Sequence, residues 1–465
     1  MDSKNNVKIN NIPIVPRIVL GNPTLGSSMD LRLLRRDFKP LEDSIRKRRL
    51  NENVLNEFFG KDAEWREKIA ILDGLRAEKN KLAAKIRTVG VDQDLIKKAK
   101  GIDVEIVKAE KFLAEVKERR DSLMLELPNL IDPEVPLNDV KTLVYFGIPK
   151  VDIRRIADFE EKYPGAAYEE SRSVKAQYDI IREYDLADEE KGAQLSGARF
   201  YYKKNELTIL DNALSLYALK ILRAKGFSPI TPPYLVKREV EAKATTLDAF
   251  AEAIYKIEGE DLYLIPTAEH PIAAYSIGRV YPQKDLPIKF AGYSPAFRKE
   301  AGSHGKDTKG IYRNHHFNKV EQYIICTPDQ TEDALNTVVN NQVELLNNLG
   351  IPLRVIKLPS WDMDKKALLH VDVEGWFPGQ NRYGELGSHA SVGSWQAARL
   401  NIKYLTSSGS ESKFVNTIYG TMSPIERTLA CVLENGFVPS TGEISIPKPL
   451  ADISGIDKIL PKSEK

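Results

Sequence analysis

The stretch FRKEAGSHGKDTKGIYRNHHFNKVEQY, from Phe297 to Tyr323, decides the fold that we expect for this chain. Apolar and polar residues alternate at both of its ends, over 297–301 and over 320–323, and strict alternation is typical of half-buried strands. The polar segment between these ends contains Gly302, Gly305 and Gly310. We therefore expect two antiparallel strands joined by a long charged loop, and loops of this length in a compact domain are usually functional or disordered.

Three charged side chains, Arg298, Glu300 and Glu321, are expected to share one face of this hairpin. Charged groups on a sheet face need solvent, an ionic partner or a ligand, because burying them alone is costly. Spacing alone leaves two interpretations open. The face is either solvated and crossed by ion pairs, or it binds a ligand.

The same stretch resembles motif 2 of the class II aminoacyl-tRNA synthetases. In detail it is similar to the seryl-tRNA synthetases of archaea and the eukaryotic cytoplasm, most densely in FRKEAGSHGKDTKG. The resemblance extends from about Met29 to about Lys462. It implies an α+β protein with an N-terminal antiparallel coiled-coil hairpin and a class II catalytic domain. That domain has a mixed, mainly antiparallel sheet flanked by helices, and the resemblance places the protein in the cytoplasm.

Length and composition bound the remaining possibilities. A chain of 465 residues favours two or three domains, and 42% hydrophobic residues are enough for a sizeable core. The net charge is only +2, so contact with nucleic acid needs local basic patches. The two cysteines, Cys326 and Cys431, lie in apolar runs and suit neither a disulfide framework nor a four-ligand zinc site. No run approaches the length of a transmembrane helix, and we expect no membrane partner.

The sequence divides into four parts. Residues 1–28 carry three prolines and no secretory apolar core, so we interpret them as a mobile extension. Residues 29–135 are expected to form a helical arm, 136–183 a connector with prolines that stop the preceding helix, and 184–465 the catalytic domain.

The helical arm contains a predicted coiled-coil hairpin at about 55–127. Mostly apolar residues recur alternately three and four positions apart in its second half, which is a heptad seam. The first half is less regular, with Trp65, Ile69, Leu72, Ala83 and Ile86. Gly90 is expected to end the first helix, and Asp92 or Asp94 to cap the second. The seam consists of Leu95, Ala99, Ile102, Ile106, Ala109, Leu113, Val116, Arg120, Leu123 and Leu127.

Basic residues gather at the tip of this hairpin. An ordinary solvated helix surface explains such a pattern, and so does an arm that follows the phosphates of a structured RNA. The resemblance favours RNA, because in the family this arm grips the long variable arm of serine tRNA. The predicted tRNA-binding residues are Lys79, Lys81, Lys85, Arg87, Lys97, Lys98 and Lys100.

The catalytic part shows strand and helix patterns in succession. A strand is expected in 197–204, an amphipathic helix over 207–221 ended by Gly226, and an edge strand in the proline-rich GFSPITPPYLV. Alternation at 262–275, 286–297, 322–328 and 353–358 predicts further strands, which favours a mixed antiparallel sheet with packed helices. By resemblance, GFSPITPPYLV is motif 1 and forms a homodimer interface.

An adenylate-forming site must position a triphosphate and neutralise its charge, and arginine forks suit phosphate oxygens. The resemblance gives Arg298 the α-phosphate and the amino acid carboxylate, and Arg313 the γ-phosphate. Glu300 and the backbone near Asn314 would read adenine, on which Phe317 would stack. Without the family, Phe317 is equally a core residue.

Two later segments complete the expected ATP site. In YGELGSHAS, the resemblance assigns magnesium to Glu385 and Ser388, whose oxygen atoms suit a hard cation. In TMSPIERTLACVLEN it identifies motif 3, whose Arg427 would contact the triphosphate. This segment predicts a buried helix with Thr421 and Ser423 as capping candidates. Taken alone, Glu385 is an exposed turn residue and Arg427 a helix-surface ion pair. The expected catalytic residues are Arg298, Glu385 and Arg427.

The expected serine pocket is small. A site that hydrogen-bonds the serine hydroxyl rejects alanine, because its own polar groups would be left unpaired. By resemblance, Glu321 accepts from this hydroxyl with Thr421 as its partner, and Arg298 binds the carboxylate. Thr267 and Glu269 of PTAEHP would hold the α-amino group, although a strand-end turn also explains this segment.

Three observations concern departures from the family and metals. Tyr419 stands where motif 3 usually has asparagine, close to the expected serine and ATP site, and HASVGSW after Glu385 also departs from the family. His304, His315 and His316 have neither the spacing nor the companions of a metal site, and we expect no zinc. The expected cofactor is Mg²⁺ bound with ATP.

The resemblance therefore implies a member of the seryl-tRNA synthetase family whose substrates are serine, ATP and tRNA(Ser), with tRNA(Sec) as a further substrate where one exists. Two alternatives stay open. An adenylate-forming paralog that loads a carrier protein or a metabolite has less need of a basic hairpin. A non-catalytic RNA-binding or regulatory protein on a degenerate synthetase fold has no need of Arg298, Glu300, Glu321, Glu385 and Arg427.

Overall fold

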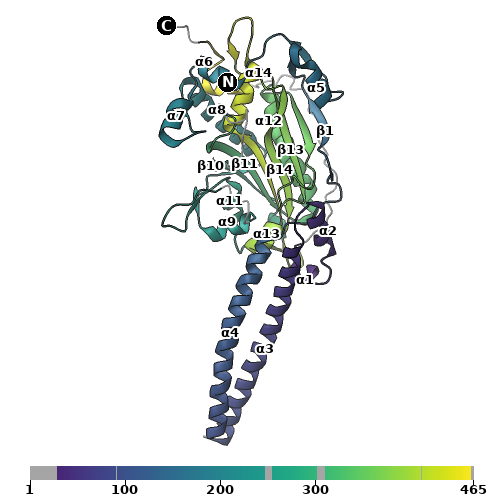
Figure 1. Ribbon diagram of the computed structural model, residues 1–465, viewed down its shortest axis with the longest axis vertical. Coiled ribbons are helices and arrows are strands. Elements are labelled where there is room, and N and C mark those ends of the chain that lie inside the picture. The colour runs from purple at the N-terminus through teal and green to yellow at the C-terminus, as the bar shows by residue number, and fades with distance from the viewer. Residues whose placement is uncertain (1–28, 91, 247–253, 301–308, 410, 462–465) are drawn as a thin grey trace, which may run out of the picture. The chain divides into compact units, whose positions relative to one another are not determined.

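A computed structural model describes residues 29–90, 92–246, 254–300, 309–409 and 411–461 (Figure 1). The predicted extension at 1–28 lies outside the described residues. The chain folds as two compact units, one built mainly from Leu31–Pro128 and the other containing Asn129–Thr245 and most of the chain beyond it.

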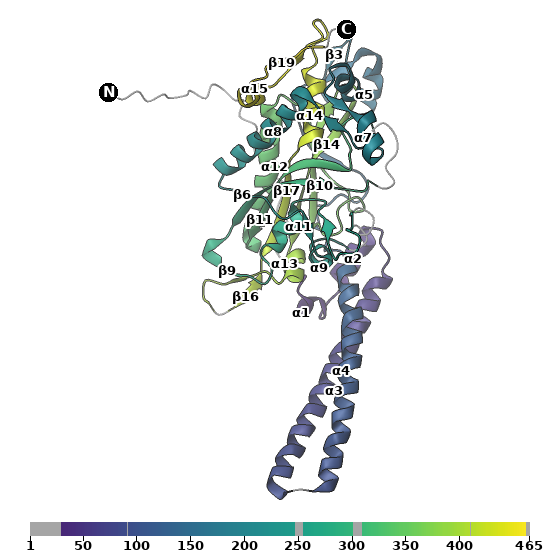
Figure 2. The same cartoon turned by 90° about the vertical axis from the view of Figure 1, so that its left-hand side faces the viewer.

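The first unit contains the predicted helical hairpin. Its helices α3 (Asn53–Val89) and α4 (Gln93–Glu126) lie side by side in Figures 1 and 2, preceded by α1 (Leu31–Leu34) and α2 (Lys39–Lys47). Gly90 follows α3 with a φ of +89°, which favours glycine. Asp92 caps α4, because its side chain accepts hydrogen bonds from the backbone N–H groups of Asp94 and Leu95. The hairpin and both of its helix ends confirm the prediction.

The apolar seam of α4 is present, since every predicted position is buried or half-buried. The predicted seam of α3 is wrong at one position. Ala83 is exposed, whereas Leu75 and Leu82 are half-buried and continue the contact line. Lys79 Nζ pairs with Asp103 of α4 at 2.6 Å, and Arg76 pairs with Glu110 at 2.9 Å, so the charges that interrupt the apolar pattern bridge the two helices.

The second unit is organised around a sheet of eight strands, in which every neighbouring pair is antiparallel except β6 and β10. In spatial order the strands are β1 (Lys141–Phe146), β12 (Leu353–Lys357), β13 (Leu369–Phe377), β14 (Arg382–Gly393), β17 (Asn416–Pro424), β11 (His316–Cys326), β10 (Ile288–Phe297) and β6 (Ser228–Ile230). The mixed, mainly antiparallel sheet confirms the predicted fold class. The proline-bearing β6 is an edge strand, as predicted.

Helix α12 (Thr331–Asn348) covers one face of this sheet, where it packs on β17 and β14 (Figure 1). Glycine in β17 permits this close approach, because a Cβ at Gly420 would lie 2.8 Å from the Cβ of Val338 in α12. Side chains alternate along a strand, so the neighbours Tyr419 and Thr421 point to the opposite face. That face holds the cavity described below.

The other elements surround the sheet. Helices α8 (Asn205–Ala224) and α14 (Ile425–Gly436) pack on it and on each other. The smaller elements are β2 (Lys150–Asp152), α5 (Ile156–Lys162), β3 (Glu169–Ser171), α6 (Gln177–Glu183), β4 (Ala187–Asp188), α7 (Glu189–Ser196), β5 (Tyr202–Lys203), β7 (Leu235–Val236), α9 (Arg238–Ala244), β8 (Tyr263–Leu264), α11 (Glu269–Ala274), β9 (Val280–Pro282), α13 (Trp395–Leu400), β15 (Lys403–Leu405), β16 (Ser412–Phe414), β18 (Ile444–Ser445), α15 (Lys448–Ser454) and β19 (Lys458–Ile459).

The expected shared face of Arg298, Glu300 and Glu321 is wrong for Glu300. Strand β10 ends at Phe297, opposite His316, and Arg298 makes the next contact by donating its N–H to the His315 carbonyl at 2.9 Å. Glu300 has a φ of +49°, outside the extended region, so it leaves the sheet. The expected strand stops early because β11 offers no partner before His316. Its predicted last residue, Ala301, and the loop glycines Gly302 and Gly305 lie outside the described residues.

Two further expectations are corrected. The alternating segment over 262–275 is a strand only at β8 and then becomes helix α11, which begins where the Glu269 N–H donates to the Glu321 carboxylate at 3.0 Å. Ser423 lies in β17 and donates to the Thr428 hydroxyl at 3.1 Å instead of capping α14. Pro424 holds the cap position there, and no side chain caps the helix.

Candidate active site

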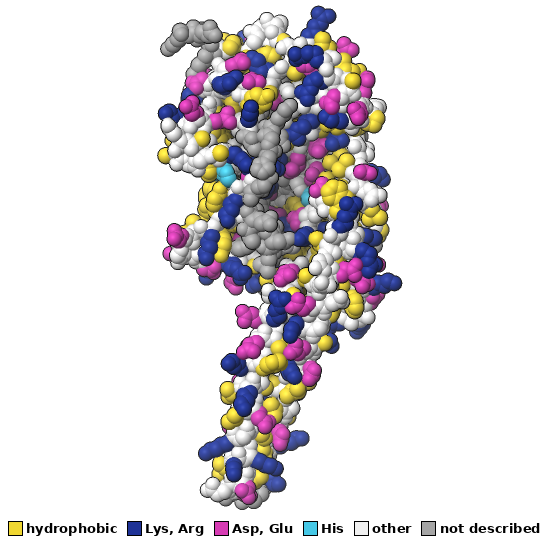
Figure 3. Space-filling view, viewed as in Figure 1, with side chains coloured by type: hydrophobic (Ala, Val, Ile, Leu, Met, Phe, Trp, Pro, Cys, Tyr) yellow, Lys and Arg dark blue, Asp and Glu magenta, His cyan; other side chains and the backbone are white. Residues whose placement is uncertain are grey.

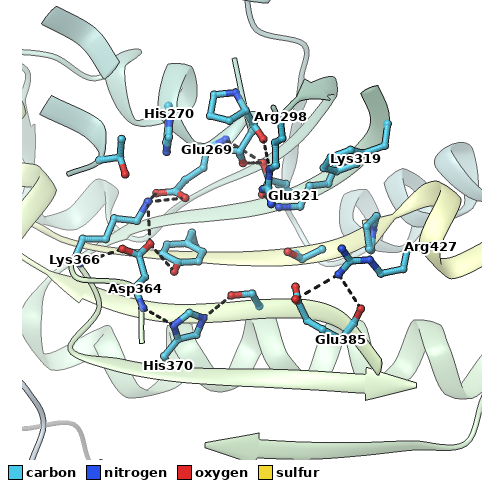
Figure 4. A pocket seen from close by; sticks show the side chains of 18 of the residues that line it. Glu269, His270, Arg298, Lys319, Glu321, Asp364, Lys366, His370, Glu385 and Arg427 are labelled. Atoms are coloured by element: carbon cyan, nitrogen blue, oxygen red, sulfur yellow. Dashed lines mark hydrogen bonds and ion pairs between the residues drawn. The ribbon is translucent and has the colours of Figure 1, made fainter. Parts of the chain in front are cut away.

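A cavity of about 330 Å³ opens on the face of the sheet opposite α12, and Figure 4 shows 18 of the side chains that line it, ten of them labelled. Strands β11, β14 and β17, helix α11 and the segments beside β10 and β13 all contribute to its wall. Nine of the residues predicted from the sequence line it: Thr267, Glu269, Arg298, Phe317, Glu321, Glu385, Ser388, Thr421 and Arg427.

A smaller cavity of about 20 Å³ adjoins the first, with which it shares Phe317, Pro424 and Arg427 in its wall. It contains the remaining predicted ATP residues, Glu300, Arg313 and Asn314. Arg313 Nε lies 3.4 Å from Glu300 Oε2, so these two side chains form an ion pair. The structure thus brings all twelve predicted substrate-site residues to two adjoining cavities.

Two β-bulges explain how residues at uneven spacing face the same cavity. Between Val373 and Glu374 of β13, strand β14 has one extra residue, so Glu385 and Ser388 share a face although they are three positions apart. A second bulge in β17 shifts the register between Val320 and Glu321. It sets Thr421 directly opposite Glu321.

Glu321 is the most firmly held carboxylate of the site. It is only 2% exposed, and Lys319 Nζ lies 2.5 Å from its Oε1. The Thr267 hydroxyl and the Glu269 N–H donate to Oε2. Burial alone would raise the pKa of Glu321, but Lys319 and these hydrogen bonds together lower it to about 2. The carboxylate is therefore an ionised acceptor at neutral pH.

Arg298 has a different environment. Its Nε donates to the Pro266 carbonyl at 3.1 Å, and its guanidinium lies 5.4 Å from the centre of the Phe317 ring. Among the residues that the structure describes, it forms no ion pair with a carboxylate. A guanidinium with that environment in a cavity wall is suited to bind an anionic ligand.

Arg427 and Glu385 form the opposite end of the cavity (Figure 4). Arg427 Nη1 lies 3.3 Å from Glu385 Oε2 and donates to the Glu385 carbonyl at 3.0 Å. The Arg427 guanidinium also lies 4.7 Å from the centre of the Tyr312 ring. Burial would raise the pKa of Glu385, but Arg427 and Arg298 lower it below its ordinary value. The carboxylate is therefore ionised.

The predicted magnesium ligands fit a hard cation. Glu385 offers an ionised oxygen and Ser388 a hydroxyl, on one strand and in one cavity wall. His370 is hydrogen-bonded to Ser388 Oγ through Nε2, while its Nδ1 accepts from the Asp364 N–H at 3.2 Å. Because Nδ1 accepts this backbone N–H, Nε2 carries a proton and donates it to the Ser388 hydroxyl, which it orients. Two protein ligands with phosphate oxygens are a common arrangement for magnesium.

Several charged residues of this wall were not predicted from the sequence. Lys319 was predictable, because alternation places it on the same face as Glu321 two positions later. Asp364, Lys366 and His370 come from the irregular segment before β13 and from its first residues, where no periodic signal exists. His270 follows the predicted Glu269, and its Nδ1 pairs with Glu241 at 2.6 Å.

Tyr419 lies in the cavity wall, where its hydroxyl is 3.3 Å from Asp364 Oδ2. Its ring centre lies 4.8 Å from Lys366 Nζ. The large side chain at this position is thus accommodated by contacts to residues that the sequence analysis did not single out.

The predicted tRNA-binding residues lie near the turn between α3 and α4, and all seven side chains are exposed (Figure 3). Within the described part of the chain, only Lys79 of this group forms an ion pair.

The described residues contain no group of three or more His, Cys, Asp or Glu side chains able to hold a metal, and His304 lies outside them. Among the described helices, none is long and apolar enough to cross a membrane.

Comparison with known proteins agrees with this geometry. A family model described as the class II tRNA synthetase core domain (G, H, P, S and T) matches residues 253–436. The fold and the cavity wall therefore define a class II aminoacyl-tRNA synthetase core. A second model, the seryl-tRNA synthetase N-terminal domain, matches residues 29–131.

Comparison with individual proteins narrows the assignment from the class II synthetases to one family. The serine–tRNA ligase of Pyrococcus horikoshii is 37% identical over 94% of this chain and 98% of its own length. That of Thermoplasma volcanium is 38% identical over 93% and 99%. This chain belongs to the seryl-tRNA synthetase family, which confirms the predicted resemblance.

Two solved structures are similar over the same extent. The seryl-tRNA synthetase of Pyrococcus horikoshii complexed with ATP has a TM-score of 0.86 and 37% identity, covering 94% of this chain and 100% of that one. The cytoplasmic serine–tRNA ligase of Naegleria fowleri in complex with AMP has a TM-score of 0.76 and 30% identity, covering 92% and 96%.

Proposed function

We propose that this chain activates serine with ATP and transfers the seryl group to tRNA(Ser). The observation that carries the proposal is the charge pattern of the main cavity. Arg298, without a carboxylate partner among the described residues, lies beside Glu321, while Glu385 and Arg427 lie at the other end. Binding a zwitterionic amino acid beside a triphosphate requires cationic and anionic side chains in the same cavity.

In the first step, a serine carboxylate oxygen attacks the α-phosphorus of ATP. The bond from this phosphorus to the bridging oxygen breaks, and pyrophosphate leaves. Arg298 binds the reacting carboxylate and the α-phosphate, while Arg427 and Arg313 bind the leaving phosphates. Glu385 and Ser388 would hold magnesium, which neutralises phosphate charge when bound. Phe317, Glu300 and the backbone at Asn314 hold the adenine.

Selection of serine falls to Glu321. Its ionised carboxylate accepts a hydrogen bond from the serine hydroxyl, with Thr421 directly across the strand pair as its partner. Alanine would leave the charged acceptor without this donor, and such losses discriminate strongly. In the second step, the terminal ribose hydroxyl of tRNA attacks the carbonyl carbon of the adenylate, and AMP leaves.

Serine-dependent exchange of labelled pyrophosphate into ATP tests the activation step, and charging of total tRNA tests the transfer. We expect both with serine and neither with alanine. Exchange without tRNA charging would support a paralog that loads another acceptor. Absence of exchange with serine would contradict the proposed function.

We further propose that the protein acts in the cytoplasm as a homodimer and also charges tRNA(Sec) where one exists. Exposed apolar side chains near the predicted motif 1 and α11 support the dimer, because an interface between subunits would remove them from water. They include Tyr234, Leu235, Tyr275 and Ile277.

Charge reversal at the hairpin tip should weaken tRNA binding selectively. In a Lys81→Glu/Lys85→Glu/Lys97→Glu variant, we expect the KM for tRNA(Ser) to rise by roughly tenfold or more, because three phosphate-binding cations become repulsive. Pyrophosphate exchange should remain unchanged. Aminoacylation kinetics at two salt concentrations would measure the effect.

The matched control reverses three lysines of α4 that lie further from the turn, Lys108, Lys111 and Lys117, and has the same net charge change. We expect a smaller effect on the KM for tRNA in the control. Equal kinetics in both variants would remove the hairpin tip from tRNA recognition.

A further inference from the structure

Side chains from two earlier helices hold the backbone of residues 309–311, which we call the anchored segment. The Gln177 side chain, at the start of α6, donates from Nε2 to the Lys309 carbonyl at 2.9 Å and accepts the Ile311 N–H through Oε1 at 3.0 Å. Glu189, the first residue of α7, accepts the Gly310 N–H through Oε1 at 2.7 Å. Three consecutive residues are therefore bound by side chains that lie far away in the sequence.

The Gln177 amide lies directly against Gly310. The φ of Gly310 is +72°, a conformation that favours glycine, and a Cβ there would lie 2.1 Å from Gln177 Oε1. Gln177 is only 1% exposed, and a buried amide requires partners for both of its polar ends. Both partners are backbone groups of the anchored segment, so the amide holds this segment at two points.

Helix α14, which carries Arg427, fixes the position of Gln177 in turn. Glu434 lies about two turns after Arg427 in α14, and its Oε1 accepts the Gln177 N–H at 2.8 Å. Its Oε2 accepts the Gly379 N–H at 2.8 Å. Helix α6 packs on α14 (Figure 1), and Glu434 is buried, so water does not compete for these hydrogen bonds. The anchored segment and Arg427 are thus positioned from the same helix.

The residues directly after the anchored segment lie at the predicted ATP site. Tyr312 and Arg313 line the smaller cavity together with Arg427. The Tyr312 carbonyl accepts from Arg427 Nε at 3.3 Å. Because consecutive Cα atoms are only about 3.8 Å apart, a shift at Ile311 is passed on to Tyr312 and Arg313. Small displacements of binding groups are costly where a site must position reacting groups.

We propose that Gln177 and Glu189 are positioning residues for ATP, because by holding the anchored segment they place Tyr312 and Arg313 at the triphosphate. This inference rests on the proposed function. Among the described residues that line the two cavities, neither Gln177 nor Glu189 is present, so both act through the backbone that they hold. Helices α6 and α7 thereby gain a part in nucleotide binding.

Glu189 provides the first test, because its side chain is only half-buried and its removal disturbs the core little. In Glu189→Ala, we expect the KM for ATP in pyrophosphate exchange to rise about 3- to 10-fold, since one hydrogen bond to the anchored segment is lost. The Kd for ATP, measured by calorimetry with Mg²⁺ and without serine, should rise by the same factor. The KM for serine should stay within about twofold of the wild-type value.

Two matched variants separate the hydrogen bond from other effects. Glu189→Gln keeps an oxygen acceptor for the Gly310 N–H, so we expect a KM for ATP within about twofold of the wild type. Glu190→Ala removes the neighbouring, exposed carboxyl group and should retain wild-type kinetics.

Gln177→Ala provides the second test. It removes two hydrogen bonds to the anchored segment, so we expect the KM for ATP to rise by about 10-fold or more, again with little change in the KM for serine. Gln177 is buried, and a thermal unfolding curve shows whether this variant keeps its fold. If it does not, the Glu189 series decides the question.

Several results would overturn the inference. An unchanged KM for ATP in Glu189→Ala would exclude the positioning role. Equal rises in the KM for ATP and for serine, or a lower kcat with both KM values unchanged, would mean that these contacts only maintain the fold. A Glu189→Gln variant as weak as Glu189→Ala would assign the effect to charge and would also contradict the inference.

Failure of the proposed function gives a different result. In that case the wild type itself shows no serine-dependent exchange. The Kd for ATP of the wild type and of the Glu189 variants still decides whether Glu189 positions the nucleotide site.

Discussion

Replacement of Arg298 by alanine should lower kcat/KM for serine-dependent pyrophosphate exchange by about 10³-fold or more, because a preorganised donor to the reacting groups is lost. Among the described residues, the side chain donates a hydrogen bond to the Pro266 carbonyl and contacts the Phe317 ring. Loss of these contacts should cost about 1 kcal/mol of folding free energy. Exchange kinetics and a thermal unfolding curve would measure the two effects separately.

Arg298→Lys is the matched variant for this prediction. It keeps the positive charge but loses the planar fork that binds two oxygens at once, so we expect activity between those of the wild type and the alanine variant. An alanine variant that retains exchange within about tenfold of the wild type would exclude a direct contact between Arg298 and the reacting groups.

Glu321→Ala should abolish serine-dependent exchange. The substitution removes the acceptor for the serine hydroxyl and leaves the Lys319 ammonium in a buried site without its partner. Breaking a buried ion pair costs about 3–5 kcal/mol, so a loss of stability is expected as well. Exchange should be measured below the unfolding temperature of the variant, together with ATP binding, which we expect to persist.

Glu374→Ala provides a control with similar damage to the fold. Glu374 pairs with Arg354 across β12 and β13 and does not line the cavity, so its removal also breaks a largely buried ion pair. We expect it to lower stability and retain exchange. Near-normal exchange by Glu321→Ala would show that the serine pocket is assigned incorrectly.

The low pKa of Glu321 predicts how the KM for serine depends on pH. Because its pKa is about 2, the carboxylate stays charged when the pH falls from about 8 to 5. The KM for serine should therefore show no inflection from Glu321 in this range. An inflection that disappears in Glu321→Gln would contradict the low pKa.

The hairpin and the arginines predicted to bind ATP illustrate what can be predicted from neighbouring residues. Heptad spacing specifies the seam of α4, and Gly90 and Asp92 mark its turn, because these signals act over a few residues. The resemblance of the motif segments likewise predicted Arg298, Glu385 and Arg427 as catalytic residues. The structure places all three side chains in the wall of one cavity.

The sequence by itself determined the class of fold, the hairpin and the set of candidate ligands for serine and ATP. Only the tertiary structure decided that the β14 bulge turns Glu385 and Ser388 to one side and that the TAE segment enters a helix. It also revealed that Lys366 engages Glu269 and that Asp364 lines the same cavity. Periodicity and capping depend on residues a few positions apart. The balance of charge in a cavity depends on side chains brought together from across the chain, and no local pattern records it.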